Sequence, residues 1–304
     1  MATIAELNKL FAVENHAKIV SGKGRLPTVK VKNQAAEATI SFLGAQLISF
    51  IPNGFTETIW LSKASKFVDG NPIRGGIPIC WPWFGKNQDD PNLPMHGFAR
   101  HTLWDLENIS PIDDKTTMVI FVLKPNKESC KLWNYDFTLR AIFTISDTLE
   151  VELVTTNKDS KPFTISQGIH TYFKVDNIAN ISIDGFQKLK YFDKVGGAND
   201  IKKQKDEPIV VNQEIDAVFL NAKGPFTVSD PIAKRTITIT NKGSNSAVVW
   251  NPWKERSKKL SEYTPHSYKT MICVETCNAL DDARGVKPGQ SHSIKASYSF
   301  DKLN

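Results

Sequence analysis

The sequence has few cysteines and no long apolar run. Four cysteines occur in 304 residues, and none of them belongs to a CxxC pair. Cys273 and Cys277 lie four residues apart, but no other Cys or His stands near them at the spacing of a zinc site. We therefore expect free, partly buried thiols in a reducing compartment. No stretch approaches the ~18 apolar residues of a membrane-spanning helix.

A strong charge of one sign is also absent. The net charge of +6 comes from 38 basic and 32 acidic residues, and the lysines are scattered, whereas nucleic-acid-binding proteins gather them on one face. The first ten residues contain an early acid and lack the apolar stretch of a secretory signal. We expect a cytoplasmic monomer without nucleic-acid or membrane partners. A mild positive potential suits a small anionic substrate.

Helical periodicity is scarce, and strand patterns dominate. Apolar residues alternate over 139–145 and 149–153 around a short polar turn, which predicts a long antiparallel hairpin. Residues 236–240 and 246–250 repeat this pattern around a second turn at 241–243. The sequence therefore predicts an all-β protein, a large antiparallel β-sandwich with few short helices. We expect these helices at 4–11 and 253–260, within one domain that covers 1–304 and has an N-terminal extension at 1–27.

Two segments interrupt the strand pattern. The segment 74–85 holds two prolines, three aromatic residues and three glycines, so it is expected to be a rigid aromatic loop rather than a central strand. Such a loop can stack on a sugar ring or simply close one end of the sandwich. The segment 96–100 carries His96 and Arg100 around a glycine. Arg74 and Arg100 each present a planar cation that matches phosphate geometry.

Two further residues are chemically unusual for their surroundings. Glu275 stands inside the apolar strand 271–277, although glutamate is rarely buried unless it is paired or takes part in chemistry. His170 stands in a strand-like segment among aromatic residues. Taken singly, Glu275 is also consistent with a buried ion pair, and His170 with a hydrogen-bonded core histidine.

Taken together, seven segments resemble the hexose-6-phosphate mutarotase branch of the aldose 1-epimerase family. They occur in the family's order, and the resemblance extends from about residue 38 to the final strands. The segments are 73–78, 81–85, 96–100, 104–106, 170–173, 248–253 and 272–275. One position departs from the pattern, because Met95 stands where the family often has glutamine.

The resemblance implies a galactose mutarotase-like supersandwich and an isomerase without metal or cofactor. Such an enzyme interconverts the α and β anomers of a hexose 6-phosphate, here expected to be glucose 6-phosphate. By similarity, His170 is the general acid at the ring oxygen and Glu275 is the general base at the anomeric hydroxyl. We expect the pKa values of both groups to lie near neutrality. The family pattern also assigns substrate contacts to Arg74, His96, Arg100 and Asp216.

Two other functions are compatible with the same fold. A non-catalytic carbohydrate-binding or metabolite-sensing protein would need no proton donor and acceptor, so the presence of both His170 and Glu275 argues against it. An epimerase of unphosphorylated sugars would leave Arg74 and Arg100 without an anionic partner.

Overall fold

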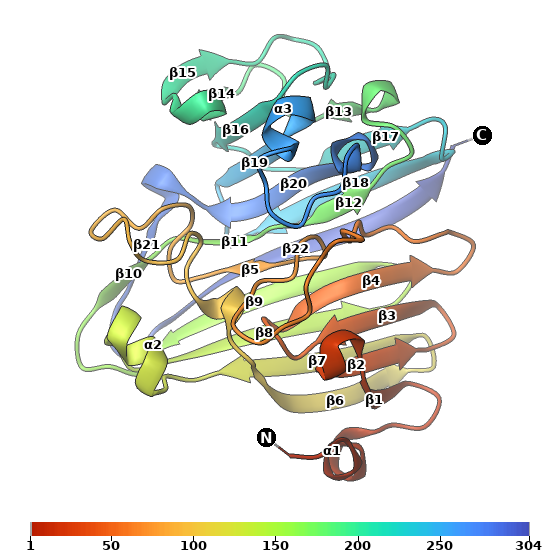
Figure 1. Ribbon diagram of the computed structural model, residues 1–304, viewed down its shortest axis with the longest axis vertical. Coiled ribbons are helices and arrows are strands. Elements are labelled where there is room, and N and C mark those ends of the chain that lie inside the picture. The colour runs from red at the N-terminus through yellow and green to blue at the C-terminus, as the bar shows by residue number, and fades with distance from the viewer. Residues whose placement is uncertain (1, 304) are drawn as a thin grey trace.

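The computed structural model describes residues 2–303, which form two large antiparallel sheets and two smaller ones (Figure 1). We name the two large sheets the β20 sheet and the β22 sheet. The β20 sheet consists, in order, of β15 (Asp200–Lys203), β14 (Lys190–Asp193), β16 (Ile215–Leu220), β19 (Ser246–Asn251), β20 (Met271–Asn278), β11 (Gln167–Ile169) and β5 (Ile79–Cys80), and β12 (Tyr172–Lys174) also pairs with β20.

The β22 sheet is the second large layer, and two small sheets complete the fold. The β22 sheet has the order β13 (Ser182–Asp184), β17 (Phe226–Asp230), β18 (Arg235–Lys242), β22 (Ser291–Lys302), β9 (Leu149–Asn157), β8 (Phe137–Ile145), β7 (Thr116–Leu123) and β6 (Asp105–Asp113). The two small sheets are β1 (Ala17–Ser21), β2 (Pro27–Lys32), β3 (Ala36–Ser41) and β4 (Gln46–Pro52), and the pair β10 (Phe163–Ile165) and β21 (Arg284–Val286). The prediction of an all-β sandwich is confirmed.

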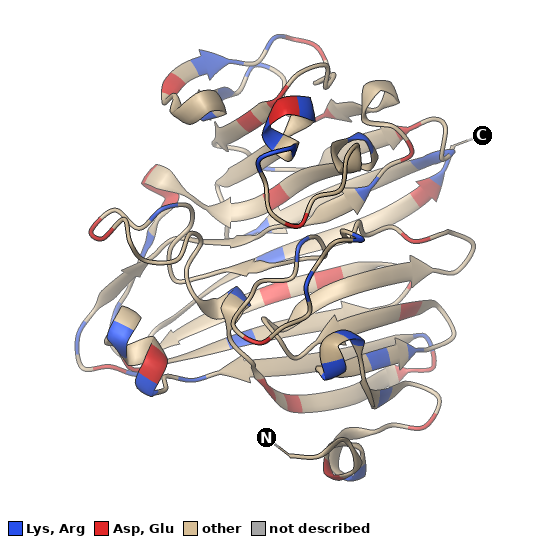
Figure 2. Cartoon of the chain, in the orientation of Figure 1, with Lys and Arg blue, Asp and Glu red and all other residues tan. Residues whose placement is uncertain are grey.

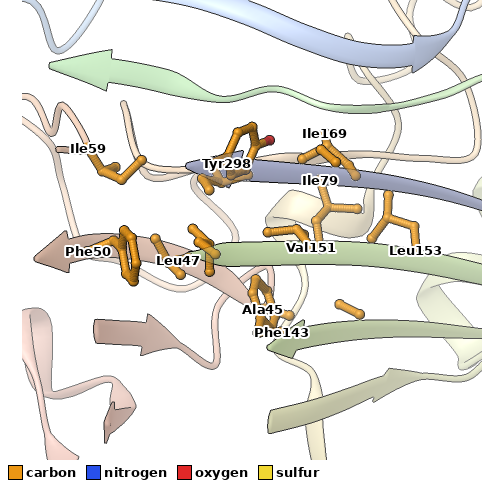
Figure 3. Packing of buried hydrophobic residues seen from close by; sticks show 14 of the residues in the cluster. Ala45, Leu47, Phe50, Ile59, Ile79, Phe143, Val151, Leu153, Ile169 and Tyr298 are labelled. Atoms are coloured by element: carbon orange, nitrogen blue, oxygen red, sulfur yellow. The ribbon is translucent and has the colours of Figure 1, made fainter. Parts of the chain in front are cut away.

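The main core lies between the sheets, and β20 is buried on both of its faces. Ile272 and Val274 point into this core, where β22 and β9 contribute apolar side chains such as those of Tyr298 and Val151 (Figure 3). Because side chains alternate along a strand, Cys273 and the other odd-numbered residues of β20 point to the opposite face. That second face belongs to separate apolar clusters.

One predicted hairpin is confirmed, and the pairing of the other is wrong. The strands β8 and β9 pair antiparallel, with Ile145 opposite Leu149 beside the turn. The strands β18 and β19 also form, but β18 pairs with β17 and β22, whereas β19 pairs with β16 and β20. The chain therefore crosses between the two large sheets at the predicted turn. Gly243 allows this crossing, because a Cβ atom there would lie 2.0 Å from the Ser293 carbonyl oxygen.

Three short α-helices occur in residues 2–303. The first, α1 (Ile4–Phe11), has the predicted bounds and begins with a capping box between Thr3 and Glu6. The last, α3 (Trp253–Ser257), ends earlier than predicted. The helix α2 (Lys127–Leu132) was not predicted, because six residues are too few for a periodic pattern. No helix in residues 2–303 is long and apolar enough to cross a membrane.

Candidate active site

Glu275 and His170 meet on the outer face of the β20 sheet, which points away from the main core. Glu275 is in β20, and His170 occupies the two-residue gap between β11 and β12, both of which pair with β20. The Nδ1 atom of His170 lies 3.3 Å from Oε1 of Glu275, and both side chains are buried. The structure thus brings together two residues that are 105 positions apart in the sequence.

Aromatic rings hold the imidazole of His170 in place. The ring of Tyr172 stacks on it at a centroid distance of 4.7 Å and an interplanar angle of 3°. Trp250 meets the edge of both rings at 6.0 Å. Since rings packed on two sides restrict rotation, the imidazole is preorganised beside the carboxyl group.

Burial separates the pKa values of the pair. It raises the pKa of Glu275 well above the usual value, and the negative charge of Asp216 raises it further. Burial also lowers the pKa of His170 to about 3, with the charges of Arg100 and Arg74 as additional causes. The expectation that both pKa values lie near neutrality is therefore wrong for His170. Burial therefore favours the neutral form of each group, a protonated carboxyl on Glu275 and an uncharged imidazole on His170.

Arg74 and Arg100 approach the pair from two different loops. The guanidinium of Arg74 lies 5.5 Å from the ring centre of Tyr263. Arg100 donates from Nη2 to the carbonyl oxygen of Met95 at 2.6 Å. The Nε atom of each arginine is buried and has no hydrogen-bond partner within residues 2–303. Unpartnered, buried cationic donors indicate a place for an anionic ligand.

His96 lies beside His170 as a neutral hydrogen-bond donor. The two ring centres are 5.8 Å apart, and burial lowers the pKa of His96 well below the usual value, helped by the charge of Arg100. Its Nδ1 accepts a hydrogen bond from the Gly85 amide at 3.1 Å. The proton of the neutral ring is therefore on Nε2, which can donate to a hydroxyl group.

The loop that carries His96 depends on Gly97. This glycine has φ +73°, and a Cβ atom there would lie 1.9 Å from the Trp81 carbonyl oxygen. We expect Gly97→Ala to lower the free energy of unfolding by about 2–4 kcal/mol, because it adds a backbone clash to an unfavourable φ angle. Chemical denaturation measures this change.

Gly85→Ala is the matched control in the same region. Gly85 also has a positive φ, +80°, but no atom lies within 4 Å of a Cβ placed there. Gly85→Ala should lower the free energy of unfolding by only about 1 kcal/mol, which is the strain of the backbone conformation alone. Equal losses for Gly97→Ala and Gly85→Ala would contradict the proposed clash.

Asp216 borders the same face of the sheet. It is in β16 and lies opposite Trp250 of β19, which in turn lies opposite Cys273 of β20. Burial raises the pKa of Asp216 to about 6, and Arg256 partly offsets this shift. The side chain is therefore mostly ionised above neutral pH and adds negative potential near Glu275.

Asp216→Asn should lower the pKa of Glu275, because it removes a negative charge that disfavours ionisation of this carboxyl. If catalysis requires the proton shared by His170 and Glu275, the alkaline limb of the kcat/KM profile then moves to lower pH. The pH dependence of kcat/KM measures this shift. Asp147→Asn, at an exposed hairpin turn, should leave the limb in place, and a shift to higher pH with Asp216→Asn would contradict the coupling.

All six predicted site residues thus lie on or beside one face, and Tyr263 is a neighbour that sequence reasoning missed. Tyr263 contacts Arg74 and packs against Trp60, and its hydroxyl is buried without a hydrogen-bond partner within residues 2–303. It stands in a polar loop with no periodic pattern, so no local signal could have identified it. Trp60 also lines a separate hollow of about 840 Å³, which contains neither His170 nor Glu275.

Charged side chains are distributed as the sequence suggested. Figure 2 shows Lys and Arg on many elements, interspersed with Asp and Glu, rather than gathered on one of them. The positive charge that matters for the site is local, from Arg74 and Arg100, and no ion pair within residues 2–303 involves either guanidinium.

The fold and this site define the class of the protein. A family model described as aldose 1-epimerase matches residues 27–299, so the chain belongs to the aldose 1-epimerase family. It is 34% identical to a curated protein of Salmonella typhimurium named "Putative glucose-6-phosphate 1-epimerase", over 90% of this chain and 92% of that protein.

Solved structures agree with this assignment. A crystal structure from Salmonella typhimurium, described as a "putative mutarotase", superposes with a TM-score of 0.89 at 29% identity, covering 98% of this chain and 99% of that one. A galactose mutarotase related enzyme of Lactobacillus acidophilus has a TM-score of 0.73 at 15% identity, covering 91% and 99%. The second likeness shows the fold alone, and the predicted supersandwich is confirmed.

Proposed function

We propose that this protein is an isomerase that interconverts the α and β anomers of a hexose 6-phosphate, with glucose 6-phosphate as the first candidate. The observation that carries the proposal is the buried His170–Glu275 pair beside two arginines with unpartnered donors. The name of the Salmonella relative supports the same substrate. A small sugar substrate follows from the family, and its phosphate group is part of the proposal.

The pair supplies both proton transfers that ring opening needs. A hemiacetal opens when the ring oxygen gains a proton and the anomeric hydroxyl loses one. His170 is proposed to donate to the ring oxygen, and Glu275 to accept from the anomeric hydroxyl. After rotation about the C1–C2 bond the roles reverse, the opposite anomer closes, and the pair is restored.

The proton must first move from Glu275 to His170. In the free protein the carboxyl holds it, and Nδ1 of His170 is 3.3 Å away but outside hydrogen-bond geometry. Such contacts tighten when substrate binds. A phosphate dianion beside Arg74 and Arg100 would offset the positive charges that lower the pKa of His170. Both arginines lower the pKa of His170, whereas only Arg100 is among the groups that lower the pKa of Glu275. Neutralising both arginines with phosphate therefore raises the pKa of His170 more than that of Glu275 and favours protonation of the imidazole.

The remaining residues are proposed to orient the sugar. His96 presents Nε2–H, and Asp216 presents acceptor oxygens from the far side of β19. The side chain of Met95 is 46% exposed, while its carbonyl oxygen accepts from Arg100. The backbone contact does not depend on which side chain stands at this position.

Anomer exchange is the direct test. The protein is added to α-glucose 6-phosphate, and the approach to anomeric equilibrium is followed by NMR. We expect exchange well above the spontaneous rate. Exchange at the spontaneous rate, together with measurable sugar binding, would favour the non-catalytic carbohydrate-binding protein instead. Faster exchange of free glucose than of its phosphate would favour an epimerase of unphosphorylated sugars.

The cytoplasmic location, the monomeric state and the lack of nucleic-acid partners stay predictions. Size-exclusion chromatography with light scattering tests the second of these, and a mass near the 34.0 kDa of one chain is expected.

A further inference from the structure

A third potential ligand atom lies next to the acid–base pair. Cys273 is two residues before Glu275 in β20, so both side chains point to the same face. The strand β12 pairs Tyr172 with Cys273, which brings the preceding His170 alongside. One ring nitrogen of His170, the Cys273 sulfur and a carboxylate oxygen of Glu275 all lie within 4.8 Å of one another.

Two atoms of this cluster are buried polar atoms that form no hydrogen bond within the described residues. Nδ1 of His170 and Oε2 of Glu275 have no hydrogen-bond partner within residues 2–303. Buried polar atoms of this kind are rare, because desolvation without a partner is costly. Their lone pairs are therefore available to a ligand that enters from the substrate side.

We propose that His170, Cys273 and Glu275 form an inhibitory binding site for Zn²⁺. Zinc takes nitrogen, sulfur and carboxylate ligands in a tetrahedron, and three protein ligands leave one position for water. A thiolate ligand favours zinc over Mg²⁺ and Ca²⁺, which prefer oxygen. On binding, the Cys273 thiol and the protonated carboxyl of Glu275 each release a proton to solvent, and the resulting thiolate and carboxylate together balance the charge of the ion. This balance is needed because Arg74 and Arg100 lie close by.

Zinc at this site excludes the proposed reaction. The ion would occupy the nitrogen and carboxylate atoms that move protons, so neither group could act as acid or base. A zinc ion bound here would therefore act as an inhibitor and would take no part in the reaction. The site predicts that zinc inhibits the enzyme reversibly and that substrate and zinc compete.

Cobalt(II) is the probe that reports ligation without activity. Co²⁺ occupies zinc sites, and a thiolate ligand gives a charge-transfer absorption in the near ultraviolet. We expect this absorption in the wild-type protein, its loss on addition of Zn²⁺, and its absence in Cys273→Ala. Cys277→Ala is the matched control, since Cys277 is buried on the same face of the same strand but lies outside the cluster. It should keep the absorption.

The inhibition test is separate. Zinc should slow anomer exchange in the wild type and in Cys277→Ala, and a chelator should restore it. Cys273→Ala should need at least about tenfold more zinc, since even residues that only support metal ligands contribute 10–100-fold to affinity. Absence of the cobalt absorption in the wild type would overturn the proposal, whatever the variants do. Equal zinc sensitivity of Cys273→Ala and the wild type would also overturn it.

The metal site and the proposed reaction can fail independently. Cobalt absorption without anomer exchange would retain the metal site and reject the substrate assignment. Anomer exchange without cobalt absorption would support the substrate assignment and reject the metal site.

Discussion

Glu275→Gln is expected to lower catalysed anomer exchange of glucose 6-phosphate by about 10²–10⁴-fold, the usual contribution of a positioned acid or base. Glutamine keeps the shape of the side chain but cannot accept the proton of the anomeric hydroxyl. Because burial raises the pKa of this carboxyl and so favours its neutral form, the neutral amide should not disturb the fold. Saturation-transfer NMR of the two anomers measures the rate, and circular dichroism checks the structure.

Glu152→Gln is the matched control for this substitution. Glu152 is on β9 in the other large sheet, where its carboxylate lies 3.6 Å from Nζ of Lys295. Partly exposed ion pairs contribute little to stability, so exchange should stay within twofold of the wild type. A loss of less than about threefold in Glu275→Gln would reject this residue as the base.

Arg100→Ala is expected to lower kcat/KM for glucose 6-phosphate by roughly 10- to 100-fold, mostly through KM. The estimate follows from the loss of about 1.5–3 kcal/mol for a hydrogen bond to a charged group. Activity on free glucose should fall far less, since that sugar has no phosphate for the guanidinium to bind. The ratio of the two kcat/KM values is therefore the informative measurement.

Arg140→Ala controls for the removal of an arginine as such. Arg140 pairs with Glu107 at 2.6 Å on the other large sheet, away from the site. It should leave both substrates unaffected. Equal losses on glucose and glucose 6-phosphate in Arg100→Ala would mean that Arg100 supports the loop rather than the phosphate.

Local sequence patterns predicted the elements whose formation depends on residues close together in the chain. Alternation gave the β8–β9 hairpin because one face of each strand is buried, and the capping residues agree with α1. The pairing of β18 and β19 could not be obtained in this way. Two neighbouring strands with a turn between them look alike whether they pair or separate into different sheets, and only tertiary contacts decide between these outcomes.

In the candidate site, too, local patterns identified single residues but not the contacts between them. Glu275 was identifiable because a carboxylate in an apolar strand is unusual. Its contact with His170, the proximity of Cys273 and the role of Tyr263 depend on which strands become neighbours. Metal-site motifs in a sequence consist of residues close in the chain, whereas His170 lies between β11 and β12 and the other two residues of this set lie in β20. The direction of the His170 pKa shift was missed for a related reason, since the depth of burial is a property of the packed sheet.

The arrangement of β11, β12 and β20 has a consequence for how this family diversifies. The residues proposed for the chemistry are anchored to one strand and its immediate neighbours, whereas Arg74, Arg100 and His96 come from loops outside that ladder. Substitutions in the loops can therefore change the proposed sugar contacts while the distance between His170 and Glu275 is kept. The loops and the strand ladder still influence each other through charge, because Arg74 and Arg100 lower the pKa of His170, so a substitution at either arginine also changes the acid–base pair.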